Sequence, residues 1–336
     1  MANAAVGKPW STHATGILAG LLAGATFLFG AIDWAGSGSS AGNPRGVDVG
    51  IMLTAVIAAA LTSKPVRERA ARIIPIDPDS PVHSIALVLA VILAGTQLAA
   101  IVFTDVLAAD QKLPPLSIGD LIFQEAPFVV LAFAGVGLWI RRSFGASNVR
   151  LGVVAPAWWH LALALAAAGI FYGLSQGSAE LSQRLTPDLA DKVNQTSQHL
   201  FGALGNQGNW AGIIALGIVP GICEEILFRG ALQPRLGLIT TAVLFTAIHT
   251  EYGLSIDALS ILVFAIGLGL IRRYTNTTTS IACHVAYNIA VGIGLAGMVL
   301  NVAILVELVL IGLVIYAFSM RRRRADEVIP ETTTVR

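Results

Sequence analysis

Three short polar motifs interrupt long apolar stretches in the second half of this sequence. They are EEILFR at 224–229, FTAIH at 245–249 and HVAYN at 284–288. Ionisable side chains in apolar surroundings are costly unless they are paired, protonated or in contact with water, so they mark candidate functional sites. Together the three motifs supply carboxylates, imidazoles and an amide, which are groups that can transfer protons and donate hydrogen bonds.

The first motif contains two adjacent carboxylates that differ in their local partners. Glu225 and Arg229 are four residues apart with the acid on the N-terminal side, the favourable order for an ion pair on a helix. Glu224 lies about 100° away around the same helix and has no such partner. We therefore expect Glu225 and Arg229 to neutralise each other and Glu224 to face a site shared with another helix.

The other two motifs supply the remaining groups that hydrolysis needs. Glu224 and His249 could share and activate a water molecule as general acid and base. His284 and Asn288 are one helical turn apart and share a face, where both could donate hydrogen bonds to a developing oxyanion. These four residues predict a hydrolytic site that uses no serine or cysteine nucleophile.

Each motif also has a structural alternative, and one rival keeps the chemistry but adds a metal. Histidine and asparagine in membrane helices often make helix–helix hydrogen bonds, and Cys223 and Cys283 suit core packing better than catalysis. Glu224, His249 and His284 are a carboxylate and two imidazoles, which is also a ligand set of catalytic zinc. The sequence contains no HExxH motif that would favour this zinc alternative.

The rest of the chain must hold these motifs in a membrane. Of the 336 residues, 55% are apolar and 12% are charged, against about 25% charged residues in soluble domains, and the mean hydropathy is +0.74. A membrane-spanning helix needs about 20 mostly apolar residues. Apolar runs lie at 15–34, 47–62, 83–105, 119–140, 156–177, 209–228, 238–252, 256–271, 279–297 and 299–318. We predict an all-α, polytopic transmembrane helix bundle with about ten spans, or eight to ten because two runs are short.

The positions of Lys and Arg predict the orientation of these spans. Basic residues cluster at 64–72, 141–150, 229–235, 272–273 and 321–324. With ten spans and both termini cytoplasmic, every cluster falls on the cytoplasmic side, as the positive-inside rule requires. We therefore expect an integral, multi-pass membrane protein that contacts the lipid bilayer and no nucleic acid.

The three motifs resemble, in order and spacing, those of the CPBP family, the CAAX proteases and bacteriocin-processing enzymes also called the Abi family. EEILFRG is similar to the most recognisable block of that family, and GLGLIRRYTNTTTSIACH resembles its lead-in to the last motif. The resemblance covers about residues 205–300. It implies an intramembrane, glutamate-type endopeptidase without a cofactor, in a bacterial or archaeal cell membrane.

The resemblance also implies a role for each motif residue. Glu224 and His249 would activate the hydrolytic water, and His284 and Asn288 would form the oxyanion hole. Three further residues would support the site: Glu225, Arg229 and Phe245. The substrate would be a membrane-associated protein or peptide, lipidated or not. Eukaryotic members remove the last three residues of prenylated CAAX proteins, a substrate that we do not transfer to this chain.

We divide the chain into four parts. Residues 1–178 hold about five spans without recognised motifs, 179–208 form an extracytoplasmic amphipathic segment, 209–300 form the protease core, and 301–336 form the last span and a basic polar tail. In the second part Thr186 is the expected N-cap of a helix and Pro187 its first residue. The apolar stripe of that helix consists of Leu189, Val193, Leu200 and Leu204.

Two rival functions and one geometric conflict follow from the same sequence. A non-catalytic immunity or scaffold protein could retain the pocket, whereas a transporter is disfavoured because no second half of the chain mirrors the polar motifs. The predicted span ends place Glu224 near the cytoplasmic end of one helix and His249 near the outer end of the next. For the two side chains to meet, the 209–228 helix must be longer or the 238–252 helix must be tilted or begin deeper.

Overall fold

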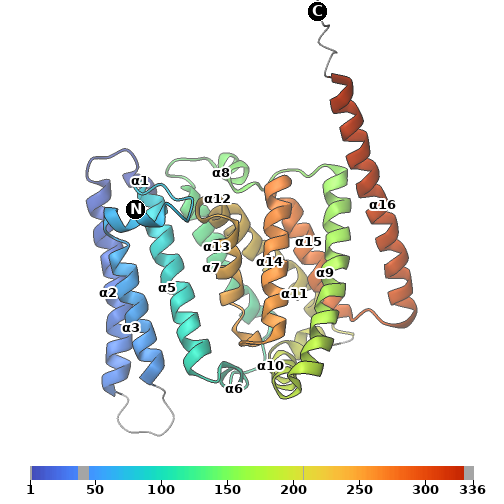
Figure 1. Ribbon diagram of the computed structural model, residues 1–336, viewed down its shortest axis with the longest axis horizontal. Helices are drawn as coiled ribbons and strands as arrows, with labels where there is room; N and C mark the ends of the chain where they lie inside the picture. The colour runs from blue at the N-terminus through green and yellow to red at the C-terminus, as the bar shows by residue number, and fades with distance from the viewer. Residues whose placement is uncertain (1, 37–44, 207, 329–336) are drawn as a thin grey trace, which may run out of the picture.

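The computed structural model describes residues 2–36, 45–206 and 208–328, which form a bundle of helices (Figure 1). No β-strand is found in these described parts of the chain. The all-α prediction is therefore confirmed, and the chain is an integral, multi-pass membrane protein.

Every predicted apolar run forms a helix, although several helix ends differ from the prediction. The helices are α1 Ala2–Ala5, α2 Ser11–Gly36, α3 Arg45–Ala60, α4 Lys64–Ala70, α5 Pro81–Phe103, α6 Val106–Asp110, α7 Ile118–Val136, α8 Phe144–Leu151, α9 Trp158–Leu185, α10 Pro187–Gly205, α11 Trp210–Glu225, the π-helix η1 Ile226–Leu232, α12 Gln233–Leu236, α13 Leu238–Ala247, the 3-10 helix η2 Thr250–Tyr252, α14 Ile256–Tyr274, α15 Thr277–Ile293 and α16 Gly297–Val328.

The predicted number of spans, about ten, is higher than the number that length and composition support. Six helices in the described residues are long and apolar enough to cross a membrane, or seven if α3 and α4, which meet at a bend of 100°, count as one span. The difference comes from α13, α14 and α15. α13 has ten residues, α15 has 17, and α14 carries Asp257 at its start and Arg272 and Arg273 at its end.

The helices form three groups along the longest dimension of the molecule. α2, α3 and α5 pack together at one side, and α7, α9, α11, α14 and α15 form the central group with η1 and α13 (Figure 1). α16 packs against α9 at the other side, and the apolar part of α16 is not buried by protein. The three polar motifs all belong to the central group.

The helix that carries the first motif is longer than the predicted run 209–228. α11, η1 and α12 follow one another as one apolar helix of 27 residues, Trp210–Leu236, so Glu224 lies near its middle. The next helix, α13, is correspondingly short, and His249 directly follows its end. These two corrections remove the conflict in depth between Glu224 and His249.

Glycines allow α11 and α15 to approach each other closely. A Cβ atom at Gly221 would lie 2.6 Å from Cγ2 and 3.1 Å from the backbone nitrogen of Val285, and a Cβ at Gly217 would lie 2.5 Å from Cγ1 of Ile289. Small residues at such positions let membrane helices pack backbone to backbone. This approach brings the third motif against the first.

α10, the predicted amphipathic helix, packs across one end of the bundle (Figure 1), where it contacts α6, α9, α11 and η2. It begins at Pro187 as predicted, but the Thr186 side chain does not cap it and instead donates to the carbonyl of Ser182. Three members of the predicted stripe, Val193, Leu200 and Leu204, are buried. α10 is therefore docked on the protein and closes that end of the central group.

α8 and α12, which carry basic residues, lie at the opposite end from α10, together with α1 and the end of α16 (Figure 1). This common end agrees with both termini facing one side of the membrane, while the identity of that side stays a prediction. The basic polar tail is helical as far as Val328, and residues 329–336 lie outside the described residues. The loop at 37–44, which contains no Lys or Arg, also lies outside the described residues.

Candidate active site

A cavity of about 1060 Å³ lies within the central group, between α5, α7, α10, α11, α14, α15 and η2. Its walls include five of the residues selected from the sequence: Glu224, Phe245, His249, His284 and Asn288. The structure therefore brings together residues from three motifs that are spread over positions 224–288 of the chain. Glu225 and Arg229 lie behind this wall and are fully buried.

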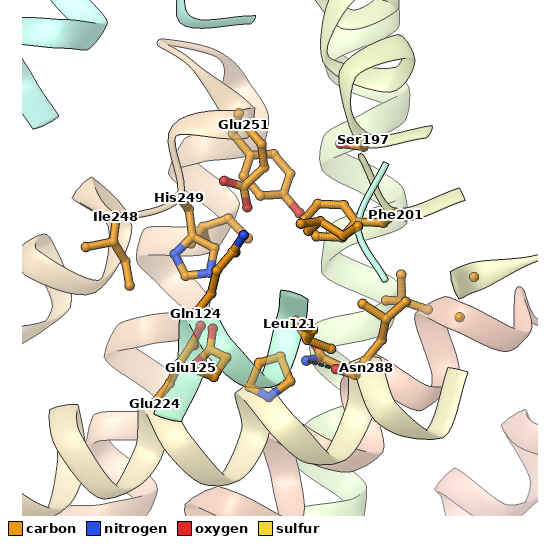
Figure 2. A pocket seen from close by; sticks show the side chains of 18 of the residues that line it. Leu121, Gln124, Glu125, Ser197, Phe201, Glu224, Ile248, His249, Glu251 and Asn288 are labelled. Atoms are coloured by element: carbon orange, nitrogen blue, oxygen red, sulfur yellow. Dashed lines mark hydrogen bonds between the residues drawn. The ribbon is translucent and has the colours of Figure 1, made fainter. Parts of the chain in front are cut away.

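Glu224 is a nearly buried carboxylate that faces the cavity. Its relative exposure is 5%, and its Oε2 atom has no hydrogen-bond partner among the described residues. A buried carboxylate without a partner is costly unless water or a ligand contacts it. Glu224 is thus the side chain in this wall that is best placed to bind a water molecule in the cavity (Figure 2).

His249 has one ring nitrogen committed to the backbone. Its Nδ1 lies 2.8 Å from the carbonyl oxygen of Phe245, and because a carbonyl can only accept, Nδ1 carries the proton. In the neutral ring Nε2 is then unprotonated and can accept a proton. The short α13 helix ends at Ala247, so it presents His249 on the cavity wall as a group able to act as a base.

Glu225 joins the first and third motifs. Its Oε2 lies 3.3 Å from Nε of Arg229, and its Oε1 lies 3.1 Å from Nδ1 of His284. The predicted ion pair within the helix is present, and the same carboxylate also orients the imidazole of His284. Because Nδ1 of His284 is turned towards Glu225, Nε2 is the nitrogen left for the cavity.

Arg229 is held by more than its ion pair. Its Nη2 donates to the carbonyl oxygen of Ala265 at 3.3 Å, and its guanidinium carbon lies 4.3 Å from the ring centroid of Phe245. Phe245 also packs at 4.6 Å, centroid to centroid, against the ring of His249. These contacts connect the buried pair to the second motif, so all three motifs form one packed unit.

The backbone around Arg229 is a π-helix, η1, in which six consecutive residues from Ile226 to Ala231 are buried. π-helical turns are rare and are frequently found at functional sites. Within η1, a Cβ atom at Gly230 would lie 2.9 Å from the carbonyl oxygen of Leu151. The glycine thus lets the widened turn lie against the end of α8.

Asn288 has a structural bond that the sequence did not suggest. Its Nδ2 donates to the carbonyl oxygen of Leu216 at 3.2 Å. In an α-helix that carbonyl would accept from the residue four positions later, but this residue is Pro220, which has no N–H. Asn288 therefore satisfies a carbonyl that the proline leaves free, and its second amide hydrogen remains for the cavity.

Several lining residues were missed by the sequence interpretation. Glu125 and Gln124 enter the cavity from α7, Glu251 from η2, and Ser197 and Phe201 from α10 (Figure 2). The signal for Glu125 was present, because it is an ionisable residue within the predicted span 119–140. The same signal was present for Glu251, which lies within the predicted run 238–252. Ser197 and Phe201 could not be found, since their contribution depends on how α10 folds over the bundle.

The zinc alternative requires three ligand side chains that meet at one point. In the parts of the chain that the structure covers, no three His, Cys, Asp or Glu side chains are placed to hold one metal ion. Of the proposed zinc ligands, His284 directs Nδ1 to Glu225 and His249 directs Nδ1 to a carbonyl, so Nε2 of each ring is left free, as in histidines that bind a metal. Cys283 is buried and Cys223 is half-buried, and neither forms a disulfide.

Comparison with known proteins finds one family model that matches the part of the sequence containing this site. The family model described as "Rce1-like: Type II CAAX prenyl endopeptidase Rce1-like" matches residues 206–290, which contain all three motifs.

A curated relative, "Uncharacterized protein YpbD" of Bacillus subtilis (strain 168), is 45% identical over 66 residues, or 19% of this chain and 34% of that protein. The match thus spans about a third of the length of that relative. No solved structure matches the chain. The family match supports the resemblance to the CPBP family: residues 206–290 of this multi-pass membrane protein are similar to a CAAX-type protease.

Proposed function

We propose that this protein is an intramembrane endopeptidase of the glutamate type, which hydrolyses a peptide bond of a membrane-associated protein or peptide. The observation that carries the proposal is the carboxylate of Glu224. It is nearly buried, one of its oxygens has no partner among the described residues, and it lines the same cavity as His249. A water molecule held by Glu224 and by Nε2 of His249 would meet two groups able to accept its proton.

The reaction follows from these groups. The carboxylate of Glu224 takes a proton from the water, and the water oxygen bonds to the carbonyl carbon of the substrate. The electron pair of the C=O bond moves to the oxygen, where Nε2–H of His284 and the free amide hydrogen of Asn288 stabilise the negative charge. When the C–N bond breaks, the proton passes to the leaving nitrogen, so one water is consumed and a carboxylic acid and an amine are formed.

Glu225 and Arg229 support this reaction without touching the substrate. Glu225 accepts a hydrogen bond from His284, so the ring can hold a proton on each nitrogen and donate through Nε2. Arg229 fixes Glu225 by their ion pair. Phe245 packs between Arg229 and His249 and keeps both in position.

The test is proteolysis by the purified full-length protein in detergent. Wild type, Glu224→Gln and Glu307→Gln would each be incubated with host membrane proteins and a lipidated peptide library, with and without a metal chelator. Glu307 is a carboxylate on α16 that does not line the cavity, so its variant controls for the loss of an acid from a membrane helix. Mass spectrometry would identify new peptide termini.

We expect cleavage by wild type and Glu307→Gln, and a loss of about 10²-fold or more in Glu224→Gln, as for removal of a general base. Insensitivity to the chelator would support the glutamate mechanism, whereas inhibition would favour the zinc alternative. Equal cleavage by Glu224→Gln and wild type would remove Glu224 from the mechanism. The lipid attached to the cleaved peptides, or its absence, would define the substrate class.

A further inference from the structure

A second carboxylate, Glu125 on α7, lines the same cavity as Glu224. Figure 2 shows both side chains at this cavity, and both belong to its lining. Oε2 of Glu125 is buried and, like Oε2 of Glu224, has no hydrogen-bond partner within the described chain. The two acids come from different helices, α7 and α11, which pack against each other.

The packing of α7 fixes Glu125 at this place. Glu125 belongs to a stripe with Leu121, Phe128, Ala132 and Val136, which repeats every three or four residues and therefore lies on one face of the helix. Phe128, one turn beyond Glu125, packs edge to face against Phe228 of η1 at 5.9 Å. Glu125 is the one acidic member of a stripe that is otherwise apolar.

A purely structural role does not account for an acid at this position. Buried carboxylates in membrane helices are normally paired with a cation or fully hydrogen-bonded. Oε2 of Glu125 has no hydrogen-bond partner among the described residues, and the cavity that it lines holds a second such carboxyl, that of Glu224. Two acids that face one cavity in this way are suited to hold one water molecule and one proton between them.

We propose that Glu125 is a second catalytic carboxyl group, which shares one proton and the hydrolytic water with Glu224. This inference rests on the proposed peptidase function and assigns a further residue to its reaction. The ionised member of the pair accepts a proton from the water as the water oxygen bonds to the carbonyl carbon. The protonated member gives its proton to the leaving nitrogen as the C–N bond breaks, so the pair ends the cycle with one proton, as it began.

The test compares Glu125→Gln, Glu224→Gln, the double variant and the control Glu307→Gln with a peptide that wild type cleaves. The values of kcat and KM and the pH profile of kcat/KM are measured, and folding is checked by thermal unfolding. We expect Glu125→Gln to lower kcat by about 10²-fold or more with KM changed less than about threefold. The pH profile of wild type should have two limbs, because the active pair holds one proton, and Glu125→Gln should lose one of them.

The double variant shows whether the two acids act as one unit. We expect it to lose no more activity than Glu224→Gln alone, because groups that act together are not additive. If Glu125→Gln keeps the kcat and the pH profile of wild type while Glu224→Gln is inactive, this inference is overturned and the proposed function is left intact. An active Glu224→Gln would instead overturn the proposed function. A Glu125→Gln protein that does not fold would also overturn the inference, because it would reveal a structural partner of Glu125.

Discussion

At the scale of single residues, the acid that links two of the motifs is Glu225, which is buried and contacts both a guanidinium and an imidazole. Its side chain and that of Arg229 are 0% and 1% exposed. A buried ion pair is weak evidence for stability in itself, but removal of one partner leaves an uncompensated charge. The pair is therefore a place where a single substitution acts on both stability and catalysis.

We expect Arg229→Met to destabilise the protein by about 3–5 kcal/mol and to abolish cleavage, because Glu225 would keep only His284 as a partner. The matched control is Arg184→Met on α9, which removes another i, i+4 pair with glutamate, here exposed on both sides. That control should leave the unfolding midpoint in detergent nearly unchanged. Equal midpoints for the two variants would contradict the role given to the buried pair.

Part of the site could be predicted from the sequence at this scale, and part could not. The Glu225–Arg229 pair follows from spacing on one helix, and Glu224 was selected because it lacked such a partner. The bond from His284 to Glu225 spans 59 positions and depends on how closely two helices pack. The bond from Asn288 to the carbonyl of Leu216 could not be predicted either, because it requires knowing which helix faces Pro220.

At the scale of helices, the apolar runs predicted where helices form but not where two of them end. Arg229 and Arg235 were read as the cytoplasmic edge of a span. Arg229 is in fact buried and paired, and Arg235 donates to the carbonyl oxygen of Gly135, so neither had to reach water. The helix therefore continues to Leu236. The positive-inside rule assumes that basic residues are solvated, so it placed the end of this helix too early.

The close approach of α11 and α15 yields a prediction at this scale. We expect Gly221→Ala to destabilise the protein by about 1–3 kcal/mol and to reduce kcat, because its Cβ would lie 2.6 Å from Cγ2 of Val285 and push His284 away from Glu225.

Gly173→Ala on α9 is the matched control, since a Cβ there meets no atom within 4 Å. It should stabilise the helix by up to about 1 kcal/mol, because alanine is the better helix former. Thermal unfolding and a peptide-cleavage assay measure both effects. A Gly221→Ala protein as stable and active as Gly173→Ala would show that the helices do not pack as closely as described.

At the scale of the whole molecule, the arrangement of the helices gives the chain two ends of different character. α8 and α12 lie at one end with their basic residues, whereas α6 and α10 lie at the other (Figure 1). The sequence predicted this grouping from its basic clusters with about ten spans, whereas six or seven helices of the described residues meet the length and composition of a span. The difference lies in α13, α14 and α15, which belong to the central group with the longer helices.

The orientation can be tested with single cysteines in a chain whose Cys223 and Cys283 are replaced by alanine. Lys112 lies at the α6 end and Ser143 at the α8 end, and both are exposed. If the basic end is cytoplasmic, a membrane-impermeant maleimide should label Lys112→Cys in intact cells and Ser143→Cys only after permeabilisation. The reverse pattern would invert the predicted topology.

The π-helix η1 also limits how the chain can evolve. Each residue added to or removed from a helix turns everything beyond that point by about 100°, and η1 lies between Glu225 and the second half of its own helix. A change of length within 226–232 would therefore rotate Arg229 or the packed face of α12 out of register. Substitutions of similar size keep that register, so insertions and deletions among natural relatives should fall outside this segment.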